Sequence, residues 1–356
     1  MTDPIDRTVD KQGSLDSREW RLQQIRRQAE AAGGVDSRGI LAAESPFPAP
    51  YSGDGYYGKP LLKAPAWTFE VPLYFFTGGA AGAAAIVAGV SKLTGADPRL
   101  ARDARYLAAI GGAISPALLI ADLGMPSRFL NMLRVFKIRS PMSVGSWTLV
   151  TFSSSAAAAA FLCAVERRKR GFGIFQIFEG ASHFLSAISG AALATYTGVL
   201  IGATAIPVWN ENVGLLPIHF AASGMGAAAS MLELRGHETP ALNAIGIIAS
   251  IGETLVGASI ELRKGPALKP LKSGRSGWLT RLGSLLSGPL PLVLRVLALG
   301  SNRRRSARLR RVAAVSTVAG SILTRFAWTQ AGRISAKDPT VPLKLAGKPR
   351  IQRADE

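Results

Sequence analysis

Ionisable and hydroxyl-bearing residues stand near the ends of long apolar runs in this sequence. Glu70 and Tyr74 begin the first run, Asp122 ends the second, Arg128 follows shortly after, and Tyr196 lies in the second half of the fourth. Ionisable groups in or just below a bilayer are costly, which makes them functional candidates. Carboxylate, phenol and guanidinium groups at one membrane face suit a quinone, because they can hydrogen-bond its carbonyl oxygens and carry its proton. The alternative is structural: Asp122 caps its helix or pairs with Arg128 and only fixes the loop.

Membrane-spanning helices are needed to position these residues. A helix requires about 20 apolar residues to cross a hydrocarbon layer of about 30 Å. Runs with no charge, or with a single charged residue, cover residues 71–91, 106–121, 143–165, 180–209, 212–232, 241–260, 282–300 and 312–332. Helices of a soluble protein would keep a charged face. The sequence therefore predicts an all-α polytopic membrane protein with seven or eight spans.

Two parts of the chain fit this pattern less simply. The run at 282–300 is short and contains Pro289, Pro291 and Arg295, so it could cross the membrane or lie in the interface. Residues 1–69 and 333–356 are polar and are predicted to form an N-terminal extension and a C-terminal tail. Within the extension, residues 14–32 predict a surface helix.

The chain is strongly basic, with 42 Lys and Arg against 23 Asp and Glu and a net charge of +19. Most cations lie in short loops beside apolar runs, where they set membrane orientation. We therefore expect membrane lipid, and not nucleic acid, as the partner of this charge. Loop cations alone favour placing the loop after Asp122 outside the cytoplasm. The balance reverses if 282–300 does not cross, so the orientation stays open.

Cysteine and histidine usage bears on redox cofactors. The single cysteine, Cys163, can neither form an intramolecular disulfide nor ligate a four-cysteine cluster. A membrane haem usually needs two facing histidines. His183 and His219 begin consecutive antiparallel spans and therefore lie toward opposite faces, and His237 is in a loop. We expect no haem, no iron–sulfur cluster and no metal site in this chain.

The deepest formal charges are Glu253 in the sixth run and Arg325 in the eighth. A lone buried charge costs on the order of several kcal/mol, so the two residues are predicted to pair. In a functional version of this prediction, they belong to a proton path.

Four segments carry motifs. Residues 67–76 read Trp-x-x-Glu-x-Pro-Leu-Tyr-Phe-Phe, residues 122–147 form a basic loop with two prolines, and residues 196–210 and 320–339 close two later runs. Together they resemble the NrfD/PsrC family of quinone-reactive membrane subunits, over about residues 56–340. The loop is the most specific of these motifs. It departs from many relatives at Met125, where they have arginine.

The resemblance implies about eight helices in two four-helix bundles, residues 70–210 and 211–332, with no redox centre of their own. Menaquinone or ubiquinone would bind in the first bundle. Tyr74 matches a quinone-proximal position at the start of the first span, Asp122 an acidic position that closes the second, and Tyr196 a tyrosine in the fourth. Glu70 could replace a histidine that some members carry.

The resemblance also implies partners and a location. A ferredoxin-like [4Fe–4S] subunit would dock near the quinone site, and a molybdenum- or tungsten-pterin catalytic subunit would complete the oxidoreductase. Arg134, Lys137 and Arg139 are the expected docking cations. The multi-pass chain would lie in a bacterial cytoplasmic (inner) membrane as an electron-transfer subunit without a catalytic centre. A transporter, with midplane charges at Glu253 and Arg325, and a structural anchor without quinone chemistry are the alternatives.

Overall fold

The computed structural model describes residues 17–31, 35–36, 39–40, 60–125, 127, 129–166, 173–339 and 341–342. The chain divides into two units, Met1–Lys59 and Pro60–Glu356. In the first unit, α1 (Ser17–Ala31) confirms the predicted surface helix, and β1 (Val35–Asp36) pairs antiparallel with β2 (Gly39–Ile40).

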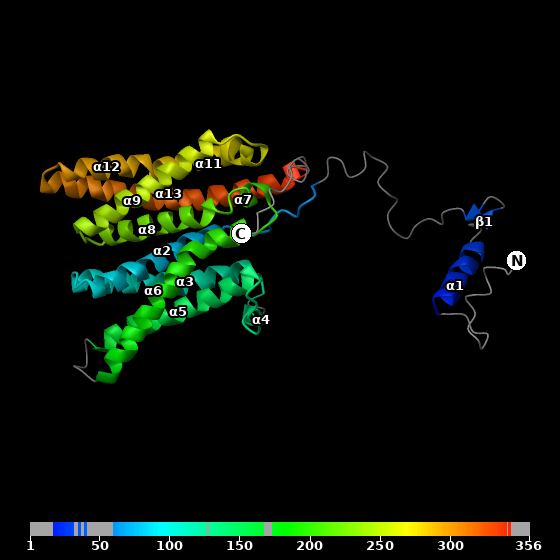
Figure 1. Cartoon of the computed structure of the whole chain (residues 1–356), viewed down its shortest axis with the longest axis horizontal. Helices are drawn as coiled ribbons and strands as arrows, with labels where there is room; N and C mark the ends of the chain where they lie inside the picture. Colours follow the sequence, from blue (N-terminus) through cyan, green and yellow to red (C-terminus); the bar gives the residue numbers. More distant parts are fainter. Residues whose placement is uncertain are drawn as a thin grey trace, which may run out of the picture. The chain divides into compact units, whose positions relative to one another are not determined.

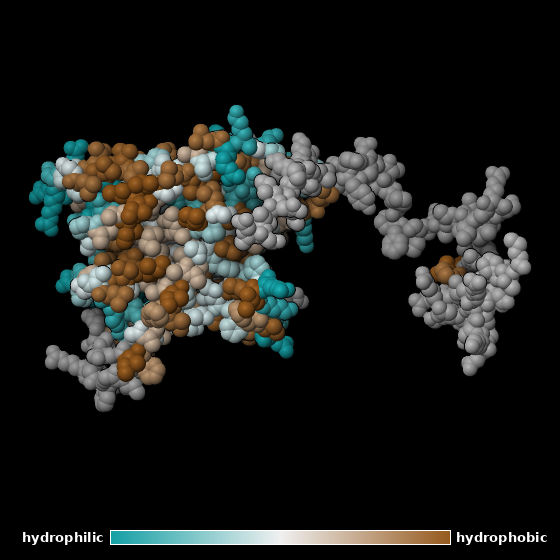
Figure 2. All heavy atoms as spheres, viewed as in Figure 1, coloured by the Kyte–Doolittle hydropathy of each residue, from teal (hydrophilic) through white to brown (hydrophobic). Residues whose placement is uncertain are grey.

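The second unit is helical, and seven of its described segments are long and apolar enough to cross a membrane. Six are single helices: α2 (Glu70–Leu93), α3 (Pro98–Asp122), α5 (Pro141–Glu166), α6 (Gly173–Gly202), α8 (Leu215–Leu234) and α9 (Pro240–Leu262). The seventh combines α11 (Gly274–Ser287) with α12 (Pro289–Leu299). Hydrophobic side chains gather over the middle of the helices and hydrophilic ones at both ends (Figure 2), as a bilayer requires. The all-α polytopic prediction is confirmed.

The doubtful run at 282–300 contains the end of α11, the break at Gly288 and all of α12. Gly288 separates α11 from α12, and Pro289 follows it without a backbone N–H to continue the helical ladder. The segment that can cross therefore begins at Gly274, eight residues before the predicted run.

An eighth long helix, α13 (Arg303–Lys337), packs along α11, α12, α8 and α2 (Figure 1). Its first turns carry the arginines of 303–311, and the rest is rich in small residues. Gly320 allows close packing, because a Cβ there would lie 2.4 Å from the backbone nitrogen of Ser287. Small residues let helix backbones approach closely in a lipid environment.

Short helices occupy one end of the second unit. They are α4 (Phe129–Met132), α7 (Pro207–Asn210), the 3-10 turn Pro266–Leu268 and α10 (Lys269–Lys272). Figure 1 shows α4 and α7 at the same end of the long helices. We call this the loop end; it contains the start of α2 and the end of α3. The far end contains the turns at 94–97, 235–239 and 300–302.

Candidate functional site

A cavity of about 190 Å³ lies at the loop end among α2, α3, α5 and α6. Three of the five predicted quinone-site residues line it: Tyr74 from the first turns of α2, Asp122 from the end of α3, and Tyr196 from the last turns of α6. Consecutive helices run antiparallel, so these distant sequence positions return to the same end. Glu70 lies outside the cavity wall, and Arg128 lies outside the described residues.

Asp122 binds the segment that leads into α2. Its Oδ1 accepts hydrogen bonds from the backbone N–H of Thr68, at 2.9 Å, and from the Thr68 hydroxyl, at 2.7 Å. The same hydroxyl contacts the carboxylate of Glu70. Asp122 thus has a structural role with a partner that the sequence did not reveal, and Thr68 links it to Glu70 near the surface.

Tyr196 is held against α5. Its hydroxyl donates to the backbone oxygen of Pro141. A Cβ on Gly145 would lie 2.1 Å from the Tyr196 ring, so only glycine allows this ring position. In the sequence, Gly145 is marked only by its membership of the 122–147 motif.

An aromatic wall closes the cavity on the side of the later helices. Trp67 stacks on Trp209 with ring centroids 5.3 Å apart and meets Phe75 edge-on at 6.0 Å. Trp209 is fully buried and its Nε1 donates to the backbone oxygen of Trp328, at 2.9 Å. The wall therefore connects the cavity to α13. In the sequence, Trp67 is marked only as the first residue of the motif at 67–76, directly before the first span.

The loop between α3 and α5 presents cations and apolar side chains together. Arg134, Lys137 and Arg139 are exposed, as are Val135, Phe136 and Ile138 between them. Ser143 braces this loop. Its hydroxyl accepts a hydrogen bond from the Lys137 backbone N–H, at 3.0 Å, and donates one to the Val135 carbonyl, at 3.1 Å. A charged and apolar surface on a fixed loop is suited to binding another protein.

Glu253 and Arg325 do not form the predicted direct pair. Glu253 accepts a hydrogen bond from Ser287, at 2.7 Å, and its other oxygen lies 3.4 Å from His219 Nδ1. Arg325 donates to the Phe220 carbonyl at 3.0 Å and lies 3.8 Å above the Phe220 ring. His219 and Phe220 are adjacent on α8. Glu253 lies beside His219, and Arg325 contacts Phe220.

Glu253 also reaches a cavity of about 270 Å³ between α9 and α11. Glu261 and Arg281 line the same cavity near the loop end and are joined by a 2.7 Å ion pair. Glu253 lies nine residues before the end of α9, about 14 Å below the loop end. The cavity thus leads from the loop end to a buried carboxylate.

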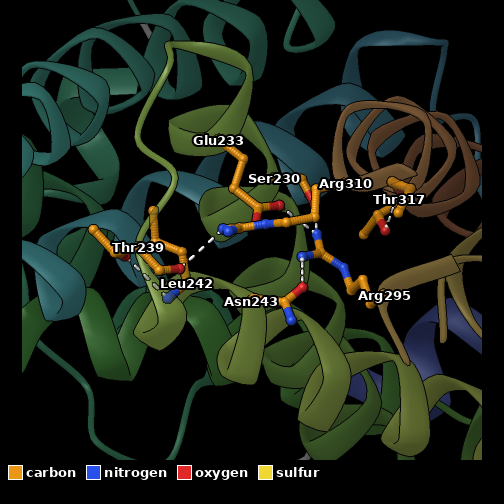
Figure 3. A network of polar contacts seen from close by, with 9 residues as sticks. Ser230, Glu233, Thr239, Leu242, Asn243, Arg295, Arg310 and Thr317 are labelled. Carbon is orange, nitrogen blue, oxygen red and sulfur yellow. Dashed lines mark hydrogen bonds and ion pairs between the residues drawn. The ribbon is translucent and has the colours of Figure 1, made fainter. Parts of the chain in front are cut away.

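A second buried charge network, which the sequence interpretation missed, lies toward the far end (Figure 3). Glu233 forms ion pairs with Arg295, at 2.7 Å, and with Arg310, at 2.6 Å. Arg295 also contacts Ser230 and Asn243, at 3.1 and 3.4 Å. The available signal was Arg295 inside an apolar run, directly before the basic start of α13.

A protein family matches most of the chain. Residues 54–337 match the family described as polysulfide reductase, of the NrfD type. The chain belongs to this family. The matched region contains every helix from α2 to α13, including the cavity, the braced loop and both buried charge networks. A search of curated proteins finds no match. Within the described residues of this family member, no group of three or more His, Cys, Asp or Glu could hold a metal ion.

Proposed function

We propose that this protein is the quinone-interacting electron-transfer subunit of a membrane oxidoreductase, with menaquinone or ubiquinone bound at the loop-end cavity. The observation that carries the proposal is the cavity itself, where Tyr74, Asp122 and Tyr196 meet within apolar walls. Its volume, about 190 Å³, is below the range of about 300–1,000 Å³ typical for drug-sized ligands, so it suits a single ring. The isoprenoid tail would extend between helices into lipid.

The residues around the cavity have separable tasks. A bound quinone supplies the two-electron, two-proton chemistry. The phenol of Tyr74 offers a hydrogen bond to a ring oxygen, whereas Tyr196 donates its proton to Pro141 and can only accept a hydrogen bond from a quinol hydroxyl. Asp122 is the proton acceptor nearest the ring, and Thr68 connects it with Glu70 toward the surface. Trp67 and Phe75 exclude water from the inner wall.

The same proposal assigns the partner surface. Arg134, Lys137 and Arg139, with the exposed apolar residues between them, would bind an acidic face of a ferredoxin-like [4Fe–4S] subunit. That position brings a cluster close to the cavity, as electron transfer requires. A molybdenum- or tungsten-pterin subunit would complete the complex in a bacterial inner membrane. Residues 70–210 would then form the quinone-binding bundle, and residues 211–332 the second.

Asp122→Asn in the purified complex tests the quinone site. We expect quinone-linked turnover to collapse, while turnover with an artificial dye that takes electrons at the catalytic subunit survives. Glu238→Gln, at an exposed carboxylate in the far-end turn at 235–239, is the control and should leave both activities unchanged. Equal loss of both activities with Asp122→Asn, although all subunits remain bound, would contradict the proposal.

Replacing Arg134, Lys137 and Arg139 together with glutamine tests the docking surface. The tagged variant should lose the iron–sulfur subunit in a pull-down, read by mass spectrometry and cluster absorbance. Replacing Arg303, Arg304 and Arg305 at the far end removes the same charge and should retain that subunit. Recovery of a lone, cofactor-free wild-type protein would favour the transporter or the structural anchor.

A proton path in the second bundle is a second candidate, favoured by the cavity that reaches Glu253. Glu253 would take up a proton from the loop end, with His219 and Ser287 as its neighbours. Arg325 would act indirectly, by holding Phe220 beside them. Glu253→Gln should reduce proton release per quinone turned over and leave turnover with the dye unchanged. An unchanged proton yield excludes this role.

A further inference from the structure

Two neighbouring cavities flank the turn between α2 and α3 at the far end. One is basic, with a volume of about 500 Å³, and the other is apolar, with about 570 Å³. Ser91 and Ala96 line both, so the cavities meet at the turn. They are at the membrane face opposite the proposed quinone site.

The basic cavity carries more positive charge than its neighbours neutralise. Its charged lining residues are Lys92, Arg99, Arg102 and Arg105. Two carboxylates pair with these cations. Glu179 pairs with Lys92 and with Arg105, and the distance to Arg105 is 3.0 Å; Asp103 pairs with Arg102 at 3.2 Å. Asp103 is shared with Arg235 and His237. Among the described residues, these four cations stand against Glu179, Asp103 and Asp97, whose carboxylate caps α3 beside Arg99, so a positive surplus remains at the cavity, which is suited to a phosphate group.

The apolar cavity has the depth of one bilayer leaflet. At the far end it begins at Asp97 and Thr239, and inside it reaches Ala221 on α8. Ala221 lies 13 residues before the end of α8 at Leu234, which corresponds to about 20 Å. One leaflet contributes about 15 Å of hydrocarbon. Between these limits the walls are aliphatic, with Val87 from α2 and Leu242 and Ile245 from α9.

We propose that the two cavities together bind one anionic diacyl phospholipid. Its phosphate lies among Arg99, Arg102 and Lys92, and an acyl chain fills the groove between α2 and α9. Charge complementarity selects an anionic headgroup, and basic pockets between membrane helices are known to suit such lipids. A soluble anion would leave the apolar groove unused, and a zwitterionic lipid would not neutralise the surplus charge. Because the groove is walled by α2, α3, α8 and α9, the lipid joins the first helices of the chain to the later ones.

The test uses the full-length chain, purified in mild detergent and stripped of lipid. Phosphatidylglycerol, phosphatidylcholine and inorganic phosphate are added separately, and binding is followed by native mass spectrometry and by the unfolding temperature. Phosphatidylglycerol should bind one to one and raise the unfolding temperature; phosphatidylcholine should bind more weakly, and phosphate should have no effect. Equal binding of both lipids, or saturation by phosphate alone, overturns the proposal.

Variants separate the headgroup from the acyl chain. Arg99→Gln with Arg102→Gln should weaken phosphatidylglycerol binding by about 25-fold, about fivefold for each cation. Arg99→Lys with Arg102→Lys keeps the charge and should retain most of the affinity. Arg304→Gln with Arg305→Gln removes two exposed cations at the same end, outside both cavities, and should have no effect.

The groove is tested with Ala221→Phe, which places a ring at its inner end. This variant should weaken phosphatidylglycerol binding without altering the headgroup contacts, so its preference for phosphatidylglycerol over phosphatidylcholine should persist. Unchanged affinity in both the Arg99/Arg102 glutamine pair and Ala221→Phe would place the lipid elsewhere and overturn the assignment.

Discussion

The earlier and later helices of this protein differ in how deeply their polar groups are buried and in which partners those groups have. Among the described residues of 60–210, the buried carboxylate is Glu179, near the far end, while Asp122 stays partly exposed at the rim of the quinone cavity. In residues 211–337, Glu233, Glu253, Arg295 and Arg325 are all at most 3 % exposed. The earlier helices therefore keep the polar groups of the quinone cavity at its rim, within reach of a ligand, whereas the later ones use theirs largely on one another.

The difference has a physical reason. A charge in the interior costs several kcal/mol unless it is paired and hydrogen-bonded. Arg295 and Arg310 converge on Glu233, and Arg325 uses a carbonyl and a ring. The cavity at the loop end avoids this cost because Asp122 is partly exposed and bonded to Thr68, and the Tyr196 hydroxyl donates to a backbone oxygen. Substitutions at the quinone cavity should therefore mainly affect quinone-linked turnover, and substitutions in the later helices should mainly affect stability.

The largest effect is expected for Glu233→Leu. This change leaves two arginines without their carboxylate in the interior, which should destabilise the protein by about 3–5 kcal/mol. The measurement is unfolding in detergent, followed by tryptophan fluorescence. Glu261→Leu breaks an exposed pair with Arg281 and should change the unfolding midpoint little. A small effect at Glu233 would mean that water, rather than Glu233, compensates the arginines.

Gly145→Ala should affect the quinone cavity more than global stability. The added Cβ would lie 2.1 Å from the Tyr196 ring, so the ring must move, at a cost of about 1–3 kcal/mol. Quinone-linked turnover should fall severalfold more than the unfolding temperature suggests. The control is Gly180→Ala on α6, where a Cβ meets nothing within 4 Å. Unaltered quinone kinetics in Gly145→Ala would remove Tyr196 from the site.

Trp209→Phe tests the junction between the two regions. It keeps an aromatic ring for Trp67 but removes the donor to the buried Trp328 carbonyl, which should cost about 1–3 kcal/mol. Unfolding monitored separately at the cavity and at α13 should remain a single transition at a lower temperature. Trp278→Phe, at a largely exposed tryptophan, is the control. Two separated transitions would show that the hydrogen bond from Trp209 to Trp328 is what makes the two regions unfold together.

The smallest effect is expected for Thr68→Val. Asp122 loses the hydroxyl donor but keeps the backbone N–H of residue 68, so about 0.5–1.5 kcal/mol should be lost. Quinone-linked turnover should decrease modestly if Thr68 passes protons between Asp122 and Glu70. Thr94→Val, at an exposed hydroxyl bonded within its own helix turn, provides the comparison. An equal response of both variants would leave Thr68 a purely structural role.

The predictions from sequence succeeded where a single run of residues contains the information. Apolar length predicted the spanning helices, and the motif at 122–147 predicted the family that the comparison confirms. Alternation of helix direction also predicted that Tyr74, Asp122 and Tyr196 share one end. The predicted pair of Glu253 and Arg325 was wrong. The position of each residue within its span indicates how deep it lies in the membrane, but not toward which neighbouring helix its side chain points.

The sequence by itself determined the class of protein, the order of its long helices and the end at which its polar motifs gather, because these depend on length, hydrophobicity and local motifs. Only the tertiary structure decided which polar groups meet. Thr68 binds Asp122 across 54 residues, His219 meets Glu253, and Arg295 and Arg310 share Glu233. Helices that are apolar all around do not reveal which face is internal, and that face is selected by the packing of small residues between distant segments.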